Sequence, residues 1–352
     1  MSLDIGDKKI LITGASGSLG KQLIYELHHR GVSPIAHVRE TSDTSFIDSI
    51  GLEKRHADLR NEAGLQKLVE GVDLVFHTAA WVNFRKDRLT QFTGINTFGA
   101  LNLFRAAQKA GVKRFIHVST VAAVGAVHRK ANGDRSLEDS LVREETEFNL
   151  GHLKIPYIMT KHAAEQELRK AAQEGPTELV TVNPSVVVAP SSTGDDRTRI
   201  LKRFNRFIMP DLPVRLNLVD IRDVAPAIIS AMCHGRSGER YILAGDNITV
   251  RDLVLAVSSI IGKVPHLLRI PRPVYDFTAR ASVVMGKLIG RGKVSYYPDL
   301  VKMLDYDWAY SSKKAREQLD YRCRSIHETL DELLTNNFTG TYLKPGNGPA
   351  TR

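Results

Sequence analysis

The chain has 352 residues, enough for one large domain or two small ones. Its composition, 42% hydrophobic and 25% charged, is ordinary for a soluble globular protein. No apolar run approaches the ~18 residues of a membrane span, and the opening MSLDIGDKK contains no apolar core of a secretion signal. The two cysteines, Cys233 and Cys323, lack metal-ligand or disulfide spacing, so we expect no metal and a reducing, cytoplasmic compartment.

The net charge is +10, and basic residues concentrate in segments 197–206 and 269–293. Such charge would suit a nucleic-acid partner. However, the sequence contains no recognised nucleic-acid motif, so we expect none. An anionic substrate or an acidic membrane surface explains the charge better.

Short apolar runs alternate with helical patterns in the first half of the chain. Strands are expected at 9–13, 33–38, 54–59, 73–80, 114–120 and 178–188, and helices at 18–31, 63–71, 94–110 and 156–174. This alternation predicts a parallel sheet covered on both faces, and apolar strands such as DLVFH fit burial on both sides. The fold class is therefore α/β, with a doubly wound parallel Rossmann sheet.

After about Pro190 the pattern changes. LNLVDIRDVAPAIISAM and RYILAG predict a strand, a helix and another strand, and mainly helices follow. We expect a dinucleotide-binding domain over 1–190, to which 214–246 returns. A smaller, mainly helical substrate domain is expected over 191–213 and 247–335, and 336–352 is expected to be a loose tail.

The motif TGASGSLG lies between the first expected strand and the first expected helix. Glycine spacing alone also occurs in structural tight turns, but this context favours dinucleotide binding. The absence of side chains lets the backbone approach a pyrophosphate, and the helix N-terminus supplies N–H groups. The cofactor contacts expected at this turn are Gly14, Ser16, Gly17, Ser18, Leu19 and Gly20.

Two strand ends bear on the kind of nucleotide. Arg39 stands in HVRE, where an acidic residue would accept the ribose hydroxyls of NAD and an arginine suits a 2′-phosphate. NADP(H) is therefore favoured and NAD(H) is the alternative, while a solvated strand-end charge is the competing interpretation of Arg39. Asp58, at the end of the third expected strand, either meets the adenine amino group or caps a helix.

The stretch PYIMTKHAAEQ predicts a helix that begins with Pro156, a favourable first residue. Tyr157 and Lys161 then lie one turn apart on one face. Spacing alone is not specific, because Tyr310 and Lys314 repeat it. That second pair is split between an extended WAY and the next helix, with Ser311 or Ser312 as the cap, so it is not expected to form a site.

Several motifs in order resemble the extended short-chain dehydrogenases/reductases, or NAD-dependent epimerase/dehydratase superfamily, over about residues 8–230. They are TGASGSLG, ADL, HTAA, NTFGALNLFRAA, VST, YIMTK, NPSVV and VDIRDVA. The C-terminal SSKKAREQLDY is similar to the end of dihydroflavonol-reductase-like members. The resemblance implies further cofactor contacts at Leu59, Thr78, Ala79, Ala80, Pro184, Tyr157 and Lys161.

The resemblance also implies a proton relay. Tyr157 would exchange a proton with a substrate oxygen while hydride moves to or from the nicotinamide. Lys161 and the positively charged nicotinamide would lower the pKa of the phenol. Thr120 would steady the substrate oxygen, with Ser119 as the fallback and strand-end capping as the alternative role. Asn96 aligns with a family Asn that is structural or holds water.

These features predict an NADP(H)-dependent oxidoreductase that reduces a ketone or aldehyde, or oxidises the alcohol, of a small hydrophobic substrate. An NAD-dependent nucleotide-sugar epimerase is the alternative, because LNLVDIRDVA and the nearby Arg215 are similar to such enzymes. A non-catalytic NADP-binding sensor or scaffold is a third reading, against which the retained relay residues argue. Val121 and Ala122 replace the Asp-Glu pair of sugar dehydratases, so dehydration is not expected.

Partners are less well defined. Trp81, Val82 and Phe84 either wall a substrate cleft or pack locally. In the expected helix 274–291, Asp276, Arg280, Lys287 and Arg291 share one face, and Val274, Phe277, Ala281 and Leu288 share another. This pattern fits either an outer packed helix or contact with an anionic membrane. The sequence leaves the oligomeric state open; members of the family that it resembles often form homodimers through the helices at 94–110 and 156–174.

Overall fold

The computed structural model describes residues 3–82, 89–129, 138–190, 208–288 and 301–335, together with Thr341; of residues 282–288 it describes the backbone alone. Phe84, Arg291, the basic segment 197–206 and the remainder of the expected tail lie outside the described residues. Among the described residues, no helix is long and apolar enough to cross a membrane.

The strands are β1 (Ile10–Thr13), β2 (Ile35–Val38), β3 (Lys54–His56), β4 (Leu74–His77), β5 (Arg114–Val118), β6 (Val127–His128), β7 (Glu178–Pro184), β8 (Val186–Val188), β9 (Ile208–Pro210), β10 (Arg215–Asp220), β11 (Arg240–Leu243), β12 (Asp246–Thr249), β13 (His266–Leu268) and β14 (Tyr306–Asp307). The α-helices are α1 (Ser18–His29), α2 (Ser45–Ser49), α3 (Glu62–Leu68), α4 (Leu89–Phe92), α5 (Ala100–Lys109), α6 (Pro156–Ala172), α8 (Ile221–His234), α9 (Val250–Ile261), α10 (Arg272–Leu288), α12 (Lys313–Leu319) and α13 (Ile326–Thr335). A π-helix, η2 (Thr93–Gly99), joins α4 to α5, and short 3-10 turns are η3 (Val121–Ala123), η5 (Glu138–Ser140) and η6 (Gly151–Leu153).

Seven parallel strands form the central sheet in the order β11-β7-β5-β4-β1-β2-β3. The chain builds outward from β1 to β3 and then returns to β4 on the other side of β1. The carboxyl ends of β1 and β4 therefore border the switch point at which open α/β sheets bind ligands. The doubly wound Rossmann fold expected from the sequence is confirmed.

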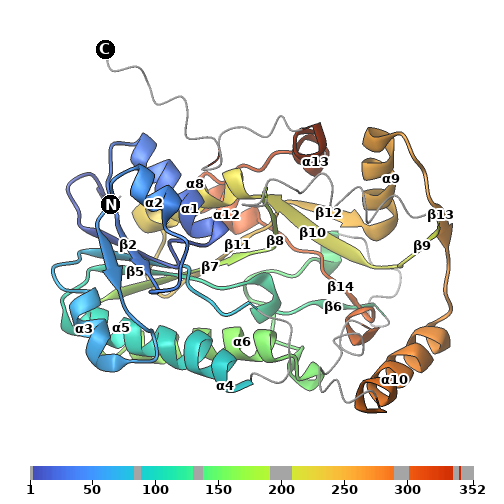
Figure 1. Ribbon diagram of the computed structural model, residues 1–352, viewed down its shortest axis with the longest axis horizontal. Coiled ribbons are helices and arrows are strands. Elements are labelled where there is room, and N and C mark those ends of the chain that lie inside the picture. Colours follow the sequence, from blue (N-terminus) through green and yellow to red (C-terminus); the bar gives the residue numbers. More distant parts are fainter. Residues whose placement is uncertain are drawn as a thin grey trace.

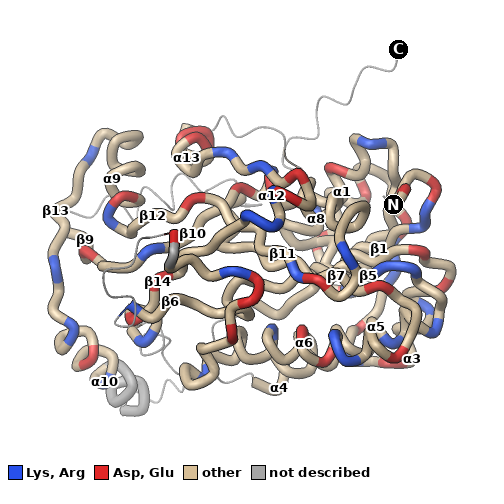
Figure 2. The backbone as a smooth tube through the Cα atoms, turned by 180° about the vertical axis from the view of Figure 1, so that it is seen from behind, with Lys and Arg blue, Asp and Glu red and all other residues tan. Residues whose placement is uncertain are grey.

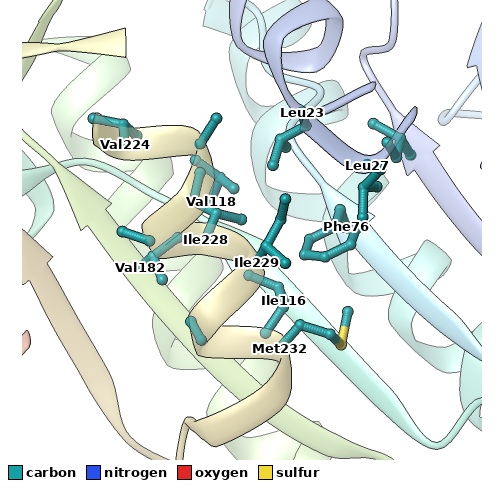
Figure 3. Packing of buried hydrophobic residues seen from close by; sticks show 14 of the residues in the cluster. Leu23, Leu27, Phe76, Ile116, Val118, Val182, Val224, Ile228, Ile229 and Met232 are labelled. Carbon is teal, nitrogen blue, oxygen red and sulfur yellow. The ribbon is translucent and has the colours of Figure 1, made fainter. Parts of the chain in front are cut away.

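Helices cover both faces of this sheet (Figure 1). Helices α1 and α8 pack on one face, and α3, α5 and α6 pack on the other. Figure 3 shows Ile228 and Met232 of α8 against Ile116 of β5 and Val182 of β7. Because each fully buried Val, Leu or Ile contributes about 1.5–3 kcal/mol, this packing fixes the strands whose carboxyl ends carry the candidate site.

The expected strand 178–188 is divided in two. β7 ends at Pro184, and β8 pairs with β10 in a separate three-stranded sheet of order β12-β10-β8. Pro184 has no N–H to donate to a ladder, and the chain leaves the central sheet immediately after it. Of the segment 214–246, β11 joins the central sheet through β7, whereas β10 does not.

The C-terminal part contains more strand than its helical pattern predicts. α9 and α13 pack over the three-stranded sheet. β9 and β13 form a parallel pair, and β6 and β14 form an antiparallel pair. α9, β13 and α10 form one end of the molecule, remote from β2 and β3 (Figure 1).

Candidate functional site

The glycine turn after β1 brings two backbone segments very close together. Gly14 has φ +71°, and a Cβ there would lie 2.8 Å from the Ala79 backbone and from the Thr78 hydroxyl. A Cβ on Gly20 would lie 2.2 Å from the Gly14 carbonyl oxygen. Only glycine allows this approach of α1 and the turn to the end of β4.

The N-terminus of α1 suits an anionic group. Its N-cap is Gly17, no side chain caps it, and its first turn contains no acidic residue. The first N–H groups of the helix therefore keep their capacity to donate, and the helix dipole favours negative charge there. This chemistry fits the pyrophosphate of a dinucleotide.

A cavity of about 400 Å³ opens beside this turn. The predicted cofactor residues that line it are Gly14, Ser16, Gly17, Arg39, Asp58, Leu59, Thr78, Ala79 and Ala80. The predicted residues outside its lining are Ser18, Leu19, Gly20, Tyr157, Lys161 and Pro184.

Sequence reasoning missed part of the lining. The additional residues are His37, Val38, Ser42, Ala57 and Ile95, together with Trp81 and Val82, which had been considered for a substrate cleft. Val38, Ala57 and Trp81 are direct neighbours of the predicted residues Arg39, Asp58 and Ala80, and they could have been found from that position. Ser42 and Ile95 are brought in by a loop and by η2, and no sequence signal marks them.

Arg39 and Asp58 face the same cavity with different partners. Arg39 is exposed, and no ion pair joins its guanidinium to another described side chain. Asp58 pairs with Arg60, whose hydrogen bond lowers the pKa of that carboxyl group to about 2. β3 ends at His56 and Asn61 caps α3, so Asp58 neither ends the strand nor caps the helix.

Thr120 is the hydroxyl residue that acts on the pKa of Tyr157, in the direction that lowers it. Tyr157 lies in the first turn of α6, and Thr120 follows β5 and caps η3. Ser119 is buried, and its hydroxyl has no hydrogen-bond partner among the described residues. Of the two hydroxyl residues, Thr120 is therefore the one that influences the pKa of Tyr157.

Lys161 is buried beside this pair. It is 1% exposed, and its Nζ donates to the Val118 carbonyl oxygen at 2.7 Å. Burial lowers the pKa of Lys161 to about 8, and the negative charge of Glu165 opposes that fall.

Burial is the main influence of the protein itself on the tyrosine. Burial raises the pKa of Tyr157, and Thr120 only opposes this rise. The lowering expected from the sequence was assigned to Lys161 together with the positively charged nicotinamide, and it did not include the desolvation of the phenol. At neutral pH Tyr157 is therefore a protonated phenol that can donate a proton.

Asn96 acts as a clamp within η2. Its Oδ1 accepts a hydrogen bond from the Trp81 N–H at 2.7 Å, and its Nδ2 donates to the Trp81 carbonyl oxygen at 3.2 Å and to the Thr160 hydroxyl at 3.3 Å. π-helices are rare and frequently occur at functional sites. Here the π-helical turn carries the amide that holds the cavity-lining segment after β4 against α6.

A row of polar residues crosses five strands at one register: His37, Thr13, His77, His117 and Thr181. The Thr13 hydroxyl lies 2.7 Å from Nδ1 of His77. Burial, followed by the nearby Lys161 charge, lowers the pKa of His77 to about 3 and that of His117 well below its usual value. Both imidazoles are therefore neutral and leave the ammonium as the positive charge there.

The repeated Tyr-Lys spacing forms no second relay. The Tyr310 hydroxyl is buried and donates to the Gly125 carbonyl oxygen at 3.0 Å, whereas Lys314 pairs with Glu239. Ser312 is the N-cap of α12, and the Ser311 hydroxyl accepts from the Lys313 N–H. Within the described part of the chain, no group of three or more His, Cys, Asp or Glu is arranged to hold a metal.

A Rossmann sheet with this glycine turn and a Tyr-Lys helix defines the short-chain dehydrogenase/reductase class. The pattern described as "NAD dependent epimerase/dehydratase family" matches residues 10–244, and the chain belongs to this family. The protein is thus an NAD(P)-dependent oxidoreductase of the short-chain dehydrogenase/reductase type, as the sequence resemblance predicted.

Two curated relatives and one solved structure are similar over most of the chain. A putative dihydroflavonol 4-reductase from Synechocystis sp. is 32% identical over 334 residues, which cover 92% of each chain. Sterol demethylase protein B from Methylococcus capsulatus is 30% identical over 266 residues, 74% of this chain and 77% of that protein. The crystal structure of gox2253 has a TM-score of 0.77 and 28% identity, covering 94% of this chain and 97% of that one.

Proposed function

We propose that the protein is an NADP(H)-dependent oxidoreductase that reduces a ketone or aldehyde of a small hydrophobic substrate, or oxidises the corresponding alcohol. The observation that carries this proposal is the buried Lys161, one turn after Tyr157 on α6, whose Nζ donates to the Val118 carbonyl oxygen at the end of β5, directly before Ser119 and Thr120. The reductase names of relatives such as the Synechocystis protein support the reaction type.

Each relay residue would have a distinct part in reduction. A bound nicotinamide dinucleotide would supply the hydride. Tyr157 donates its proton to the substrate oxygen, so hydride and proton together convert the carbonyl to an alcohol. Thr120 donates a hydrogen bond to that oxygen as negative charge develops. The ammonium of Lys161 stabilises the phenolate that remains on Tyr157.

The preference for NADP(H) rests on Arg39. Its exposed side chain lines the cavity beside Ser42, whereas the next residue, Glu40, is outside the lining and its carboxylate lies 3.5 Å from Nδ1 of His56. A guanidinium matches the geometry and charge of a phosphate. The 2′-phosphate of NADP(H) is the group that would distinguish the two nucleotides there.

The epimerase alternative gains little from Arg215. The guanidinium of Arg215 donates to Asp307 at 3.2 Å, and the backbone N–H of Arg215 donates to the same carboxylate at 2.9 Å. One side of this guanidinium therefore helps to hold β10 to β14.

The proposed reaction is tested with Tyr157→Phe. Phenylalanine keeps the ring and removes the proton, so we expect turnover of NADPH with hydrophobic ketones and aldehydes to fall by about 10²–10⁴-fold. NADPH binding, followed by the change in its fluorescence, should persist. Turnover in Tyr157→Phe within a few-fold of the parent protein would contradict the proposal.

We also propose that the end of the molecule formed by α9, β13 and α10 rests on an anionic lipid surface. Six of the eleven exposed large apolar side chains of the described residues lie on or beside these elements: Ile208, Leu255, Val264, Leu268, Val274 and Phe277. Val274 and Phe277 thus face solvent instead of packing inward. Figure 2 shows basic residues recurring along the same path. In the sequence of these elements, Lys263, Arg269 and Arg280 are exposed. Each such basic side chain contributes about 1 kcal/mol of binding free energy near an anionic surface.

Vesicle flotation tests this surface. We expect the protein to float with vesicles containing an anionic phospholipid at low salt and to remain unbound with neutral vesicles. Phe277→Glu should abolish flotation. Phe98→Glu, which changes another exposed phenylalanine, on η2, should not. Absence of binding to anionic vesicles, or equal effects of the two substitutions, would refute the proposal.

A further inference from the structure

Glu165 is a buried carboxylate one turn after Lys161 on α6. The residue is 5% exposed. A buried carboxylate is costly unless it is hydrogen-bonded and paired. Its Oε1 accepts a hydrogen bond from Nδ2 of Asn183 at 2.7 Å, and its Oε2 lies 3.6 Å from the Arg240 guanidinium of β11.

Asn183 connects this carboxylate to the relay. It lies in β7 and is 0% exposed. Besides bonding Glu165, its Nδ2 donates to the carbonyl oxygen of Thr120 at 2.9 Å. A continuous set of contacts therefore runs from Arg240 through Glu165 and Asn183 to the backbone of Thr120.

The charge of Glu165 also acts on Lys161 through space. The titratable groups that interact with this lysine are Glu165 on α6, His77 on β4 and His117 on β5, with Arg240 of β11 behind the carboxylate. Both histidines are neutral. Glu165 is therefore the acidic group that opposes the loss of the Lys161 proton on burial.

We propose that Glu165 is a positioning residue of the relay, which holds the Thr120 peptide through Asn183 and keeps Lys161 protonated at the working pH. The inference rests on the proposed oxidoreductase function. A purely structural role, in which Glu165 only ties α6 to Arg240, is the competing explanation.

Two substitutions separate these explanations, because they have opposite electrostatic signs. Glu165→Gln keeps an oxygen that accepts from Asn183 but removes the negative charge, so Lys161 should lose its proton at lower pH. Arg240→Gln removes a positive charge that offsets Glu165, so Lys161 should keep its proton to higher pH. If Glu165 only ties α6 to Arg240, both variants should lose stability to a similar extent, and neither should change the pH at which Lys161 titrates.

The titration of Lys161 can be followed without turnover. In full-length protein carrying ¹³C-labelled lysine, the Lys161 signal is assigned through its loss in Lys161→Met. We expect a midpoint near 8 in the parent protein, a lower midpoint in Glu165→Gln and a higher one in Arg240→Gln. An unmoved midpoint in both variants, or a shift in the same direction, would overturn the proposal.

The same variants should show matching kinetics. The alkaline limb of the kcat profile should move with the Lys161 midpoint, and a shift of one pH unit changes kcat on that limb about tenfold. Asn183→Ala should lower kcat through a loosened Thr120 while leaving the Lys161 midpoint within a few tenths of a pH unit. Unchanged kcat in Asn183→Ala would remove the positioning role of the amide.

Failure of this inference is distinguishable from failure of the proposed function. If Tyr157→Phe loses turnover but the Lys161 midpoint does not respond to Glu165→Gln, only the role of Glu165 is wrong. If Tyr157→Phe retains turnover, the oxidoreductase mechanism is wrong whatever the midpoint does. Arg240→Gln, on the edge strand, keeps the test available if Glu165→Gln does not fold.

Discussion

At the scale of single residues, the site depends on a lysine that is removed from water. Lys161 donates a hydrogen bond to the Val118 carbonyl oxygen, and burial lowers the pKa of Lys161 to about 8. The relay therefore has its ammonium at neutral pH and loses it in mildly alkaline solution. An exposed lysine would keep the charge to about pH 10.

We expect kcat to fall as the pH rises through about 8, the pKa of Lys161. The folded-state pKa lies below the usual 10.5 of the unfolded chain, so the unfolded state binds more protons in this window. The contribution of Lys161 to stability therefore increases as the pH rises from 8 to 10.5. Lost activity near pH 9 should occur without unfolding, which parallel kcat and thermal-melting measurements would check. A fall in kcat that begins only near pH 10 would contradict this account.

The sequence identified the side chains of the candidate relay but not their electrostatics. The helical spacing of Tyr157 and Lys161, and the hydroxyl at Thr120, can be read from the chain. The raised pKa of Tyr157 and the role of Glu165 depend on burial and on contacts with β7 and β11, which residue spacing does not reveal.

At the scale of elements, the position of α1 depends on the glycine turn. Gly20→Ala would place its Cβ against the Gly14 carbonyl oxygen, so α1 must shift. Overpacking of this kind costs about 1–3 kcal/mol in the free energy of unfolding, and nucleotide binding should weaken as well. Urea denaturation measures the first effect and fluorescence titration measures the second.

Gly64→Ala is the matched control. Gly64 lies inside α3, and the nearest atom to its added Cβ is 3.9 Å away. Replacement of an unhindered helical glycine by alanine stabilises a helix by about 0.5–1 kcal/mol. The two variants should therefore change stability in opposite directions, and equal stabilities would argue against the close approach at Gly20.

Local patterns predicted elements well where burial was uniform. Apolar strands such as β4 and β5, and helices with clear starts such as α6, agree with the expected ranges. The division of 178–188 into β7 and β8 was missed, because it depends on the distant partner β10. The π-helical geometry of η2 was also missed, because it depends on tertiary contacts such as the pairing of Asn96 with Trp81.

At the scale of the whole molecule, the central sheet places the glycine turn, Arg39 and the relay along one edge. β1, β2, β4 and β5 are parallel neighbours, so their carboxyl ends lie on the same side. The alternating pattern of the first half of the chain is sufficient to predict this arrangement. The second half gives a weaker prediction, because its short strands pair across long sequence separations and two large apolar residues of α10, Val274 and Phe277, face outward.

The central claim is an oxidoreductase that binds NADP(H) reversibly, and nucleotide titration tests it most directly. Any co-purifying nucleotide is released first, and the protein is then titrated with NADPH and NADH by fluorescence. We predict exchangeable binding that favours NADPH, with the preference lost in Arg39→Ala. Tightly retained NAD with no preference for NADPH would contradict this account and favour an epimerase.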